Sequence, residues 1–489
     1  MVMKSFFKRM LLKEDPNVYQ DKDSHLSQVL TVKDFLALGV GTIVSTSIFT
    51  LPGVVAASHA GPAVALSFLV AAIVAGLVAF AYAEMSSAMP FAGSAYSWIN
   101  VIFGEFFGWI AGWALLAEYF IAVAFVASGL SANFRGLIEP LGLVLPKQLS
   151  SAYGTSGGVI DLVAVIVVIL VGLLLARGVS GAARVENILV VLKVLAILLF
   201  VFVGLTAIHA SNYSPFIPKY HPNADGSAFG GWQGIYAGVS SIFLSYIGFD
   251  SIAANSAEAK DPKKTMPRGI LGSLVLAVIL FVSVSLVMVG MFKYSSYANN
   301  AEPVGWALRE SGHPIIAIVV QTVAVVGMFT ALIGMMMAGS RLLYSFGRDG
   351  MLPKWLGSLN KDNLPNRALV VLSIVGVILG AVFPFAFLAQ LISAGTLIAF
   401  MFVSLGIYAL RPREGKDLPE PSFKMPLYPV MPALAFLAAF AVFWGLDMGA
   451  KLYALYWFIF GLVIYFGYGM RHSFLSKRSQ AKENEEKNK

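Results

Sequence analysis

Three ionisable side chains, Lys193, Glu118 and Asp250, lie inside stretches of the chain that are otherwise hydrophobic. A charged group at the centre of a bilayer costs about 2.5–3.5 kcal/mol on insertion scales, so each of these residues is a candidate for function. Inside a membrane, such groups typically relay protons or pair with ions and charged solutes. The chemistry that we expect from them is therefore reversible binding of a proton or of a charged molecule.

Each of these residues has a functional interpretation and a structural one. Lys193 follows Arg184 by nine residues, which places it about 13 Å along a helix and near the bilayer midplane. There it could exchange a proton, replace a bound sodium ion, or only pair with a carboxylate or reach towards the interface. Glu118 could line a pocket, transfer a proton, brace an opened helix, or be a protonated core residue. Asp250 could hold a helix break open or act only as a helix cap.

Two hydrophobic stretches are interrupted by small and hydroxylated residues, at positions 39–49 and 245–251. Glycine weakens a helix, and short hydroxylated side chains compete for its backbone hydrogen bonds, so we expect both helices to open there. Open backbone at membrane depth is tolerated only where it is buried in protein or lines a cavity. A pair of interrupted segments at corresponding positions of two halves indicates a transporter's binding site.

The composition indicates an integral membrane protein made of helices. The 489 residues are 58% hydrophobic and 12% charged, whereas soluble chains carry about a quarter charged residues. The apolar runs are continuous rather than alternating, which favours a helical bundle over a barrel. The absence of cysteine excludes thiolate metal sites and iron–sulfur clusters, and the six histidines show no ligand spacing. We therefore expect no metal, no cofactor and no enzymatic activity.

The hydropathy predicts an all-α polytopic protein with twelve transmembrane helices. Counting Lys and Arg in the connections places 27 cations on the side of the N-terminus and 6 on the other, with Lys193 inside a span. The positive-inside rule then predicts a multi-pass protein of the cell membrane with both termini cytoplasmic. Because the cations alternate with the spans, we expect no nucleic acid partner. The predicted spans cover residues 35–58, 62–89, 105–132, 159–176, 185–208, 233–258, 269–292, 315–344, 368–384, 387–410, 430–447 and 452–470.

These spans divide the chain into a transport core and flanking segments. Spans 1–5 and 6–10 each begin with an interrupted helix, which favours two inverted repeats of five spans followed by two extra helices. We interpret residues 90–104 as an interfacial helix with aromatic anchors, and the charged C-terminal tail as disordered. The expected segments are a cytoplasmic N-terminal tail at 1–34, the core at 35–410, a cytoplasmic linker at 411–429, spans 11 and 12 at 430–470, and a cytoplasmic C-terminal tail at 471–489.

The ends of an opened helix suit a molecule that carries two opposite charges. The half-helix after a break begins with free N–H groups, which favour a carboxylate, and the half-helix before it ends with free carbonyls, which favour an ammonium group. An α-amino acid carries both charges one carbon apart, so we predict that the two breaks face each other and bind one. The side chains expected around it are hydroxylated at the first break and apolar at the second: Thr42, Ser45, Thr46, Ser47, Phe243, Ile247 and Phe249.

Short motifs along nearly the whole chain are similar to those of one transporter family. They are Leu51-Pro52-Gly53, Ala83-Glu84, Gly93-Ser94-Ala95-Tyr96, Gly112-Trp113, Glu118-Tyr119, Lys193, Tyr246-Ile247-Gly248-Phe249-Asp250, Asp261-Pro262, Met266-Pro267, Arg348-Asp349-Gly350 and Leu352-Pro353. On these residues the chain resembles the amino acid–polyamine–organocation (APC) superfamily, its cationic amino acid transporter group, and bacterial branched-chain amino acid permeases. The resemblance implies the five-plus-five inverted repeat with discontinuous helices 1 and 6, and sodium-independent, proton-coupled amino acid transport.

The resemblance also implies roles for individual residues. Lys193 would take the place of a sodium ion. The family pattern has glycines where this chain has Ser45 and Ser47, so we expect their hydroxyl groups to help bind the substrate carboxylate. The residues that would contact the substrate headgroup are Ile43, Thr46 and Ser47 in the first span and Phe243, Ser245 and Ile247 in the sixth.

The substrate leaves alternatives open. Because the expected walls are apolar, we favour alternating-access, H+-coupled uptake of neutral aliphatic or branched-chain L-amino acids. Glu118 would suit a cationic side chain, so transport of Arg or Lys, or amino acid exchange, is the second hypothesis. A non-transporting amino acid receptor is the alternative from another class. The expected partners are the amino acid, protons and the lipid bilayer, and we expect a monomer or a weak oligomer.

Overall fold

The computed structural model describes residues 9–23, 28–91, 93–155, 157–177, 182–224, 226–361 and 364–479. Parts of the predicted tails, at 1–8, 24–27 and 480–489, therefore lie outside the described residues. Within the described residues nearly all regular structure is helical, and a two-stranded ribbon of β1 (His221–Pro222) and β2 (Ala228–Phe229) is the one sheet.

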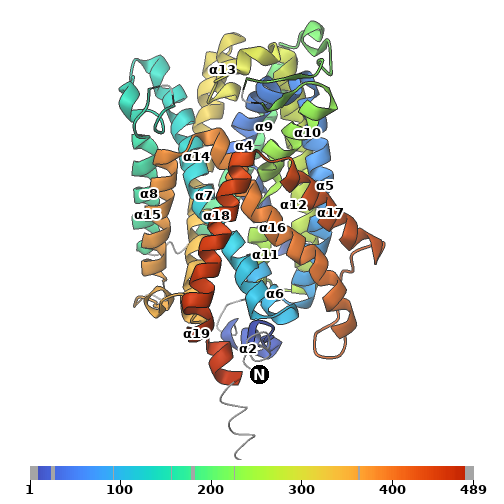
Figure 1. Ribbon diagram of the computed structural model, residues 1–489. Helices are drawn as coiled ribbons and strands as arrows, with labels where there is room; N and C mark the ends of the chain where they lie inside the picture. Colours follow the sequence, from blue (N-terminus) through green and yellow to red (C-terminus); the bar gives the residue numbers. More distant parts are fainter. Residues whose placement is uncertain are drawn as a thin grey trace, which may run out of the picture.

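The helices form a bundle of membrane-crossing length, shown in Figure 1. Eight described helical stretches are long and apolar enough to cross a bilayer, and three shorter apolar helices accompany them. One of the eight, Thr46–Ala88, turns back at Gly61, which has a φ of 59°, and so holds two crossings. Counted in this way, the described residues form twelve crossings, and the predicted all-helical polytopic fold is confirmed.

The crossings follow one another in the predicted order. They are α3 (Val32–Ile43) with α4 (Thr46–Val55), α5 (Val64–Ala88), α7 (Glu105–Ile138), α8 (Leu162–Ala176), α9 (Ala182–Leu205), α10 (Gly231–Ile242) with α11 (Phe249–Ala254), α12 (Pro262–Met291), α14 (Pro314–Arg348), α15 (Asn366–Val382), α16 (Phe385–Leu410), α17 (Val430–Trp444) and α18 (Met448–Ile464). Short helices outside the crossings are α2 (Pro16–Asp23), α6 (Ala95–Ile102), α13 (Pro303–Glu310) and α19 (Met470–His472).

The first ten crossings form two inverted halves. The first and sixth crossings are both interrupted near the middle, as α3–α4 and α10–α11. In Figure 1, α4 lies in the upper part of the bundle and α11 in the lower part, so the broken helices run in opposite directions. Equivalent helices of the two halves pack together, α5 on α12 and α7 on α14, as expected about a two-fold axis in the membrane plane.

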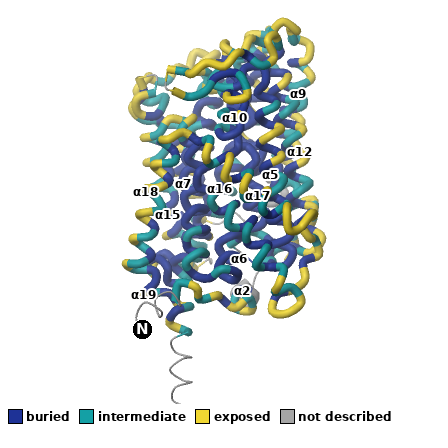
Figure 2. The backbone as a smooth tube through the Cα atoms, turned by 45° about the vertical axis from the view of Figure 1, so that its right-hand side comes forward, coloured by how far each residue is buried: buried dark blue, intermediate teal, exposed yellow. Residues whose placement is uncertain are grey.

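The bundle has a buried centre and an apolar outer surface. In the stretch that contains α7, 94% of the residues in an apolar run of 18 are buried. In the stretch that contains α18, only 17% of such a run are buried. Figure 2 shows the same contrast between the interior and the periphery. The outward-facing side chains of the peripheral helices are themselves apolar, including Ile169, Leu195, Ile378 and Val463. A helix that is apolar on every side suits a lipid environment.

The first and last described residues lie at the same end of the bundle and contact each other. Figure 1 places α2 and α19 together at the lower end. Arg9 donates hydrogen bonds to the carbonyl of Met470 at 2.7 Å and to Ser476 at 2.8 Å. Glu14 pairs with Arg478 at 3.2 Å. The prediction that the chain is disordered after Arg471 is therefore wrong for 472–479, where polar contacts rather than buried apolar side chains fix the chain.

Two connections at this end are more firmly packed than the sequence indicates. Helix α6 lies within the segment predicted to be helical, but its Tyr96 and Trp98 are buried and are not interfacial anchors. The linker after α16 is fixed by Glu84 at the end of α5, which accepts hydrogen bonds from Arg411 at 2.5 Å and from the N–H of Met425 at 2.5 Å. Both arrangements depend on contacts between distant parts of the chain.

Candidate functional site

The first break separates α3 from α4 by two residues. Val44 (φ −86°, ψ 71°) and Ser45 (φ −114°, ψ −130°) leave the helical conformation, and α4 starts at Thr46. The N–H of Val44 still bonds the carbonyl of Val40 at 2.9 Å, and that of Ser45 bonds Ile43 at 3.0 Å. The first N–H groups of α4 have no partner within their own helix, so they are available to a ligand at the break.

The second break follows a 3-10 turn at Phe243–Tyr246. Ile247 is extended, and Gly248 has a φ of +133°, a conformation that L-residues with a side chain rarely adopt. Asp250, in the first turn of α11, accepts a hydrogen bond from the N–H of Gly248 at 3.0 Å through Oδ1. The protein's own carboxylate therefore occupies the N–H end of the second break.

The two breaks are in direct contact. A Cβ atom on Gly248 would lie 3.0 Å from the backbone nitrogen of Ile43, so glycine permits this approach. The hydroxyl of Thr42 donates to the carbonyl of Leu38 at 2.9 Å and lies 3.3 Å from the carbonyl of Gly248. Ser251 of α11 donates to the Thr42 oxygen at 3.3 Å. Thr42 therefore joins the two broken helices and is not free to bind a ligand, contrary to the prediction that its hydroxyl contributes to the site.

Unpartnered polar atoms are concentrated around the breaks. Among the described residues, the buried hydroxyl groups of Thr46, Thr50 and Ser245, all on the broken helices, have no hydrogen-bond partner. Leaving a buried donor or acceptor unpaired costs about 1–3 kcal/mol, so such a cluster indicates a place where a polar solute is bound.

Lys193 connects α9 with the first broken helix and with α14. Its side chain is fully buried, and Nζ donates to the carbonyl of Gly41 at 2.9 Å. A Cβ atom on Gly327 would lie 2.5 Å from Lys193 Cε, so the stem of the lysine lies directly against α14. Gly41 belongs to the last turn of α3, where carbonyls lack partners within the helix. The ammonium group therefore occupies the carbonyl end of the first break and does not reach towards the membrane surface.

Glu118 brings a second carboxyl group to the second break. It lies on α7, is buried, and accepts a hydrogen bond from Thr396 of α16 at 2.6 Å. Its carboxyl group is close enough to that of Asp250 for the two to interact, and Tyr119 also approaches Asp250. Two ionised carboxylates near each other in a low-dielectric interior would repel each other.

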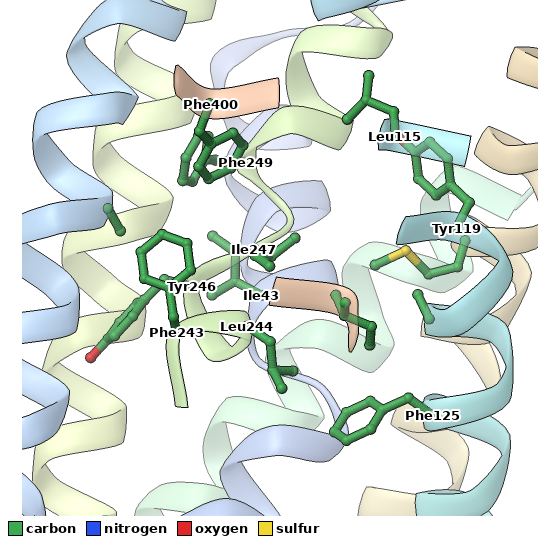
Figure 3. Packing of buried hydrophobic residues seen from close by; sticks show 14 of the residues in the cluster. Ile43, Leu115, Tyr119, Phe125, Phe243, Leu244, Tyr246, Ile247, Phe249 and Phe400 are labelled. Atoms are coloured by element: carbon green, nitrogen blue, oxygen red, sulfur yellow. The ribbon is translucent and has the colours of Figure 1, made fainter. Parts of the chain in front are cut away.

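Apolar side chains surround this polar centre. Figure 3 shows Ile43 and Ile247 side by side at the breaks, with Leu115 and Tyr119 of α7 across from them. The rings of Phe249 and Phe400 stack with centroids 5.1 Å apart. An amino acid bound at the breaks would therefore direct its own side chain towards aliphatic and aromatic groups.

The structure brings the predicted residues together but assigns the free hydroxyl groups differently. Thr46 and Ser245 have buried hydroxyls without a partner, whereas those of Ser45 and Ser47 are not among the unpartnered atoms of the described residues. Thr46 packs on Gly129 of α7. The predicted residues Ile43, Ser45, Thr46, Ser47, Phe243, Ser245, Ile247, Lys193, Glu118 and Asp250 are all buried.

Several residues of the site were not predicted. Thr50 follows Thr46 by four residues and so shares a face of α4, a spacing that is visible in the sequence. Tyr82, Thr396 and Gly327 come from three other helices, α5, α16 and α14, and no local pattern marks them.

A helical bundle whose first and sixth crossings are broken at touching points defines a membrane carrier of the inverted-repeat class. Residues 30–467 match the family described as amino acid permease, and the chain belongs to this family. The predicted family resemblance and the prediction of an amino acid permease are thereby confirmed.

Three relatives show how the family's substrates vary. The chain is 63% identical over 459 residues to a branched-chain amino acid permease of Lactococcus lactis subsp. cremoris (strain MG1363), covering 94% of this chain and 98% of that protein. It is 34% identical over 460 residues to a methylthioribose transporter of Bacillus subtilis (strain 168), covering 94% and 97%. It is 31% identical over 428 residues to the vacuolar cationic amino acid transporter 4 of Arabidopsis thaliana, covering 86% and 70%.

Proposed function

We propose that this permease is a secondary active carrier that takes up branched-chain and other neutral aliphatic L-amino acids together with protons. The headgroup binds at the two helix breaks, and the aliphatic side chain lies against the apolar walls. The relative with 63% identity, which is named a branched-chain amino acid permease, supports this substrate class.

One observation carries the proposal: the protein's own charges occupy one end of each break. Lys193 occupies the carbonyl end of the first break, and Asp250 occupies the N–H end of the second. The N–H end of α4 and the carbonyl end of α10 are left for a ligand. An N–H end favours a carboxylate and a carbonyl end an ammonium group, which together match the headgroup of an amino acid.

The substrate-binding residues follow from this arrangement. The carboxylate lies at the start of α4, near the free hydroxyl of Thr46, with Ser45 and Ser47 beside it. The ammonium group lies at the end of the 3-10 turn, near Ser245. Ile43, Phe243 and Ile247 complete the walls around the headgroup. The buried position of all these residues and the unpartnered oxygens of Thr46 and Ser245 support their roles.

Coupling to protons involves Lys193 and the Glu118–Asp250 pair. Lys193 replaces a bound sodium ion, because its ammonium group holds the carbonyl end of α3 against α14. Glu118 and Asp250 hold one proton between them. Release of this proton makes the pair more negative, beside the place where the ammonium group of the substrate binds. A substrate arriving with its own positive charge then favours the ionised pair, which links substrate and proton binding.

The proposed orientation places both termini in the cytoplasm of a bacterial cell. The meeting of α2 and α19 at one end of the bundle and the excess of cations in the connections on that side support it. The end that carries α13 is then external. The protein acts in the cell membrane as a monomer or weak oligomer, and as a carrier rather than an enzyme.

A cationic substrate is the second candidate, since two buried carboxyl groups lie near the site and a relative is named a cationic amino acid transporter. We favour the neutral substrate because Asp250 is already engaged with Gly248 and Glu118 with Thr396. Competition of labelled isoleucine uptake by all twenty amino acids separates the two. Inhibition by leucine and valine but not by lysine or arginine is the expected result.

Uptake into liposomes that contain the purified full-length chain tests transport itself. An imposed pH gradient, acidic outside, should drive accumulation of labelled isoleucine above its equilibrium level, and a protonophore should abolish it. Failure of the gradient to drive accumulation would contradict proton coupling and favour exchange. A lack of flux even under exchange conditions, with isoleucine binding retained, would indicate a non-transporting receptor.

A further inference from the structure

A second polar cavity opens at the external end of the bundle, apart from the helix breaks. Its volume is about 390 Å³, within the 300–1,000 Å³ range of small-molecule sites. It lies between the last turns of α7 and the segment that joins α12 to α13, which Figure 1 places at the upper end. The side chains that line it and matter here are Ala132, Arg135, Glu139, Asn299, Glu302 and Trp306.

Two side chains of opposite charge in this cavity form no ion pair among the described residues. Among the described residues, the guanidinium of Arg135 donates no hydrogen bond and forms no ion pair, although Asp161 lies within range of its charge, and its Nε atom is buried. Glu139 is exposed and equally without an ion pair among the residues that the structure describes. The two are four residues apart on the same helical turn, a spacing at which Arg and Glu commonly pair, yet they do not pair with each other.

The neighbouring charges are fully engaged. Arg309 forms an ion pair with Glu302 and donates to Gln321 at 2.9 Å, and both partners lie at the same end of the bundle. Burial raises the pKa of the Glu302 carboxyl, the Arg309 guanidinium opposes this shift, and the nearby Glu139 adds to it. Because Glu302 is already paired, Glu139 is the carboxylate of this cavity that is left for an entering positive group.

The cavity adjoins the cover of the first broken helix. Its lining segment continues without interruption into α13, whose first residue is Pro303. A Cβ atom on Gly53 of α4 would lie 2.8 Å from Pro303, so α13 rests directly on the external half of the first broken helix. A molecule in the cavity would thus lie beside the helix that packs on the external half of the first broken helix.

We propose that this cavity is an external amino acid site, which receives the substrate before it reaches the breaks. Arg135 binds the carboxylate, Glu139 binds the ammonium group, and Trp306 with Ala132 contacts the aliphatic side chain. Arg135 and Glu139 both line the cavity, four residues apart in the chain, and carry the two opposite charges that a zwitterion requires of its site. The inference rests on the proposed function, since its ligand is the substrate proposed for the breaks.

Initial rates of isoleucine uptake into liposomes test the site. Substituting Arg135→Gln or Glu139→Gln should raise the apparent KM about tenfold, the weight of one charge-assisted hydrogen bond, and leave the maximal rate within about twofold. Lys147→Gln and Glu310→Gln remove equal charges from exposed positions on the same face, outside the cavity, and should change neither value. If the cavity variants match these controls, or lower only the maximal rate, the inference is overturned.

A labelling experiment gives a readout that does not depend on transport. The chain has no cysteine, so Ser296→Cys, at an exposed position that lines the cavity, provides a single external thiol. Isoleucine should slow its reaction with a membrane-impermeant maleimide, and adding Arg135→Gln should raise the half-protecting concentration about tenfold. Protection that is unchanged by Arg135→Gln would overturn the site. Absence of uptake by the unsubstituted protein, with protection retained, would instead contradict the proposed transport.

Discussion

The two broken helices occupy equivalent places in the two halves, but they are held open in different ways. The first is fixed from outside, by Lys193 of α9, whose ammonium group binds the carbonyl of Gly41. The second is fixed by its own residues, a glycine in a strained conformation and the carboxylate of Asp250 two positions later. One break is therefore held by a cation at its carbonyl end and the other by an anion at its N–H end.

This difference shows how a symmetric fold produces an asymmetric site. Two identical breaks would present two free N–H ends and two free carbonyl ends. Because the protein neutralises a different end of each, one N–H end and one carbonyl end are left. A zwitterion is complementary to this pair, whereas an anion or a cation alone is not. The variants below test the comparison, from the largest expected effect to the smallest.

Replacing Lys193 should cause the largest loss of uptake, because its ammonium group binds the carbonyl end of the first break. In Lys193→Met a side chain of similar length loses the ammonium group, and the carbonyl of Gly41 is left buried without its donor. We expect pH-driven uptake to fall about 100-fold or more, since a lost charged hydrogen bond of about 1.5–3 kcal/mol adds to the loss of the coupling charge. The matched control is Lys451→Met. Lys451 is a cation at the start of α18, and its Nζ donates to the carbonyl of Trp444 at 2.8 Å. Uptake equal to the control would remove Lys193 from the mechanism.

Two substitutions of Asp250 separate charge from hydrogen bonding at the second break. Asp250→Asn keeps an oxygen for the N–H of Gly248 but cannot hold a proton with Glu118. It should retain isoleucine exchange and lose pH-driven accumulation about tenfold or more, as for removal of one general acid–base group. Asp250→Ala also removes the acceptor and should lower stability by about 1 kcal/mol, as for loss of a helix cap. Normal accumulation by Asp250→Asn would show that the charge is not needed for coupling.

Gly248→Ala tests the contact between the two breaks. The added methyl group would meet the Ile43 nitrogen at 3.0 Å in a conformation with φ of +133°, so the break should shift. A left-handed conformation costs about 1–2 kcal/mol for a residue with a side chain, which corresponds to about a tenfold lower affinity for isoleucine. Gly334→Ala, where the structure places nothing within 4 Å, should bind normally. Equal binding by the two variants would mean that close contact at Gly248 does not matter.

Ser45→Gly and Ser47→Gly should have the smallest effects. Ser45 has a negative φ that any residue adopts, so glycine at this position mainly adds flexibility. We expect apparent affinities for isoleucine to change by about threefold, less than 1 kcal/mol. Thr46→Val, which removes a free hydroxyl without changing shape, should cost more. Uptake kinetics that are unchanged in both serine variants would exclude their hydroxyls from binding.

The sequence predicts the fold and the positions of the breaks because both depend on local composition. Continuous apolar runs determine the crossings, and clusters of glycine and hydroxylated residues determine where a helix opens. The sequence does not predict which side chain bonds the free backbone groups at each break. Gly41 and Lys193 are 152 residues apart, and Glu118 and Thr396 are 278 apart, so these contacts arise only from tertiary packing. The prediction that the Thr42 hydroxyl binds the ligand fails for the same reason. Its contacts with Gly248 and Ser251 join residues that are more than 200 positions apart, so the neighbouring sequence does not reveal them.

Burial at the end of the bundle that carries α2 and α19 also exceeds what the composition predicts. Aromatic residues in α6 match the composition of an interfacial helix, yet the described chain covers it with α7 and α16. Polar residues after Arg471 match a solvated tail, yet Ser473 donates to the buried Glu105. Composition indicates how a segment behaves alone, whereas here distant segments supply the partners.

Binding of two analogues of isoleucine tests the central claim most directly. Isoleucine amide has no carboxylate, and the corresponding 2-hydroxy acid has no ammonium group, while both keep the aliphatic side chain. In competition with labelled isoleucine on the purified full-length protein, each should bind at least about 100-fold more weakly, because a site built around buried polar groups rejects a ligand that leaves them unpaired. If either analogue binds within about threefold of isoleucine, the corresponding helix end does not bind the headgroup and the account is wrong.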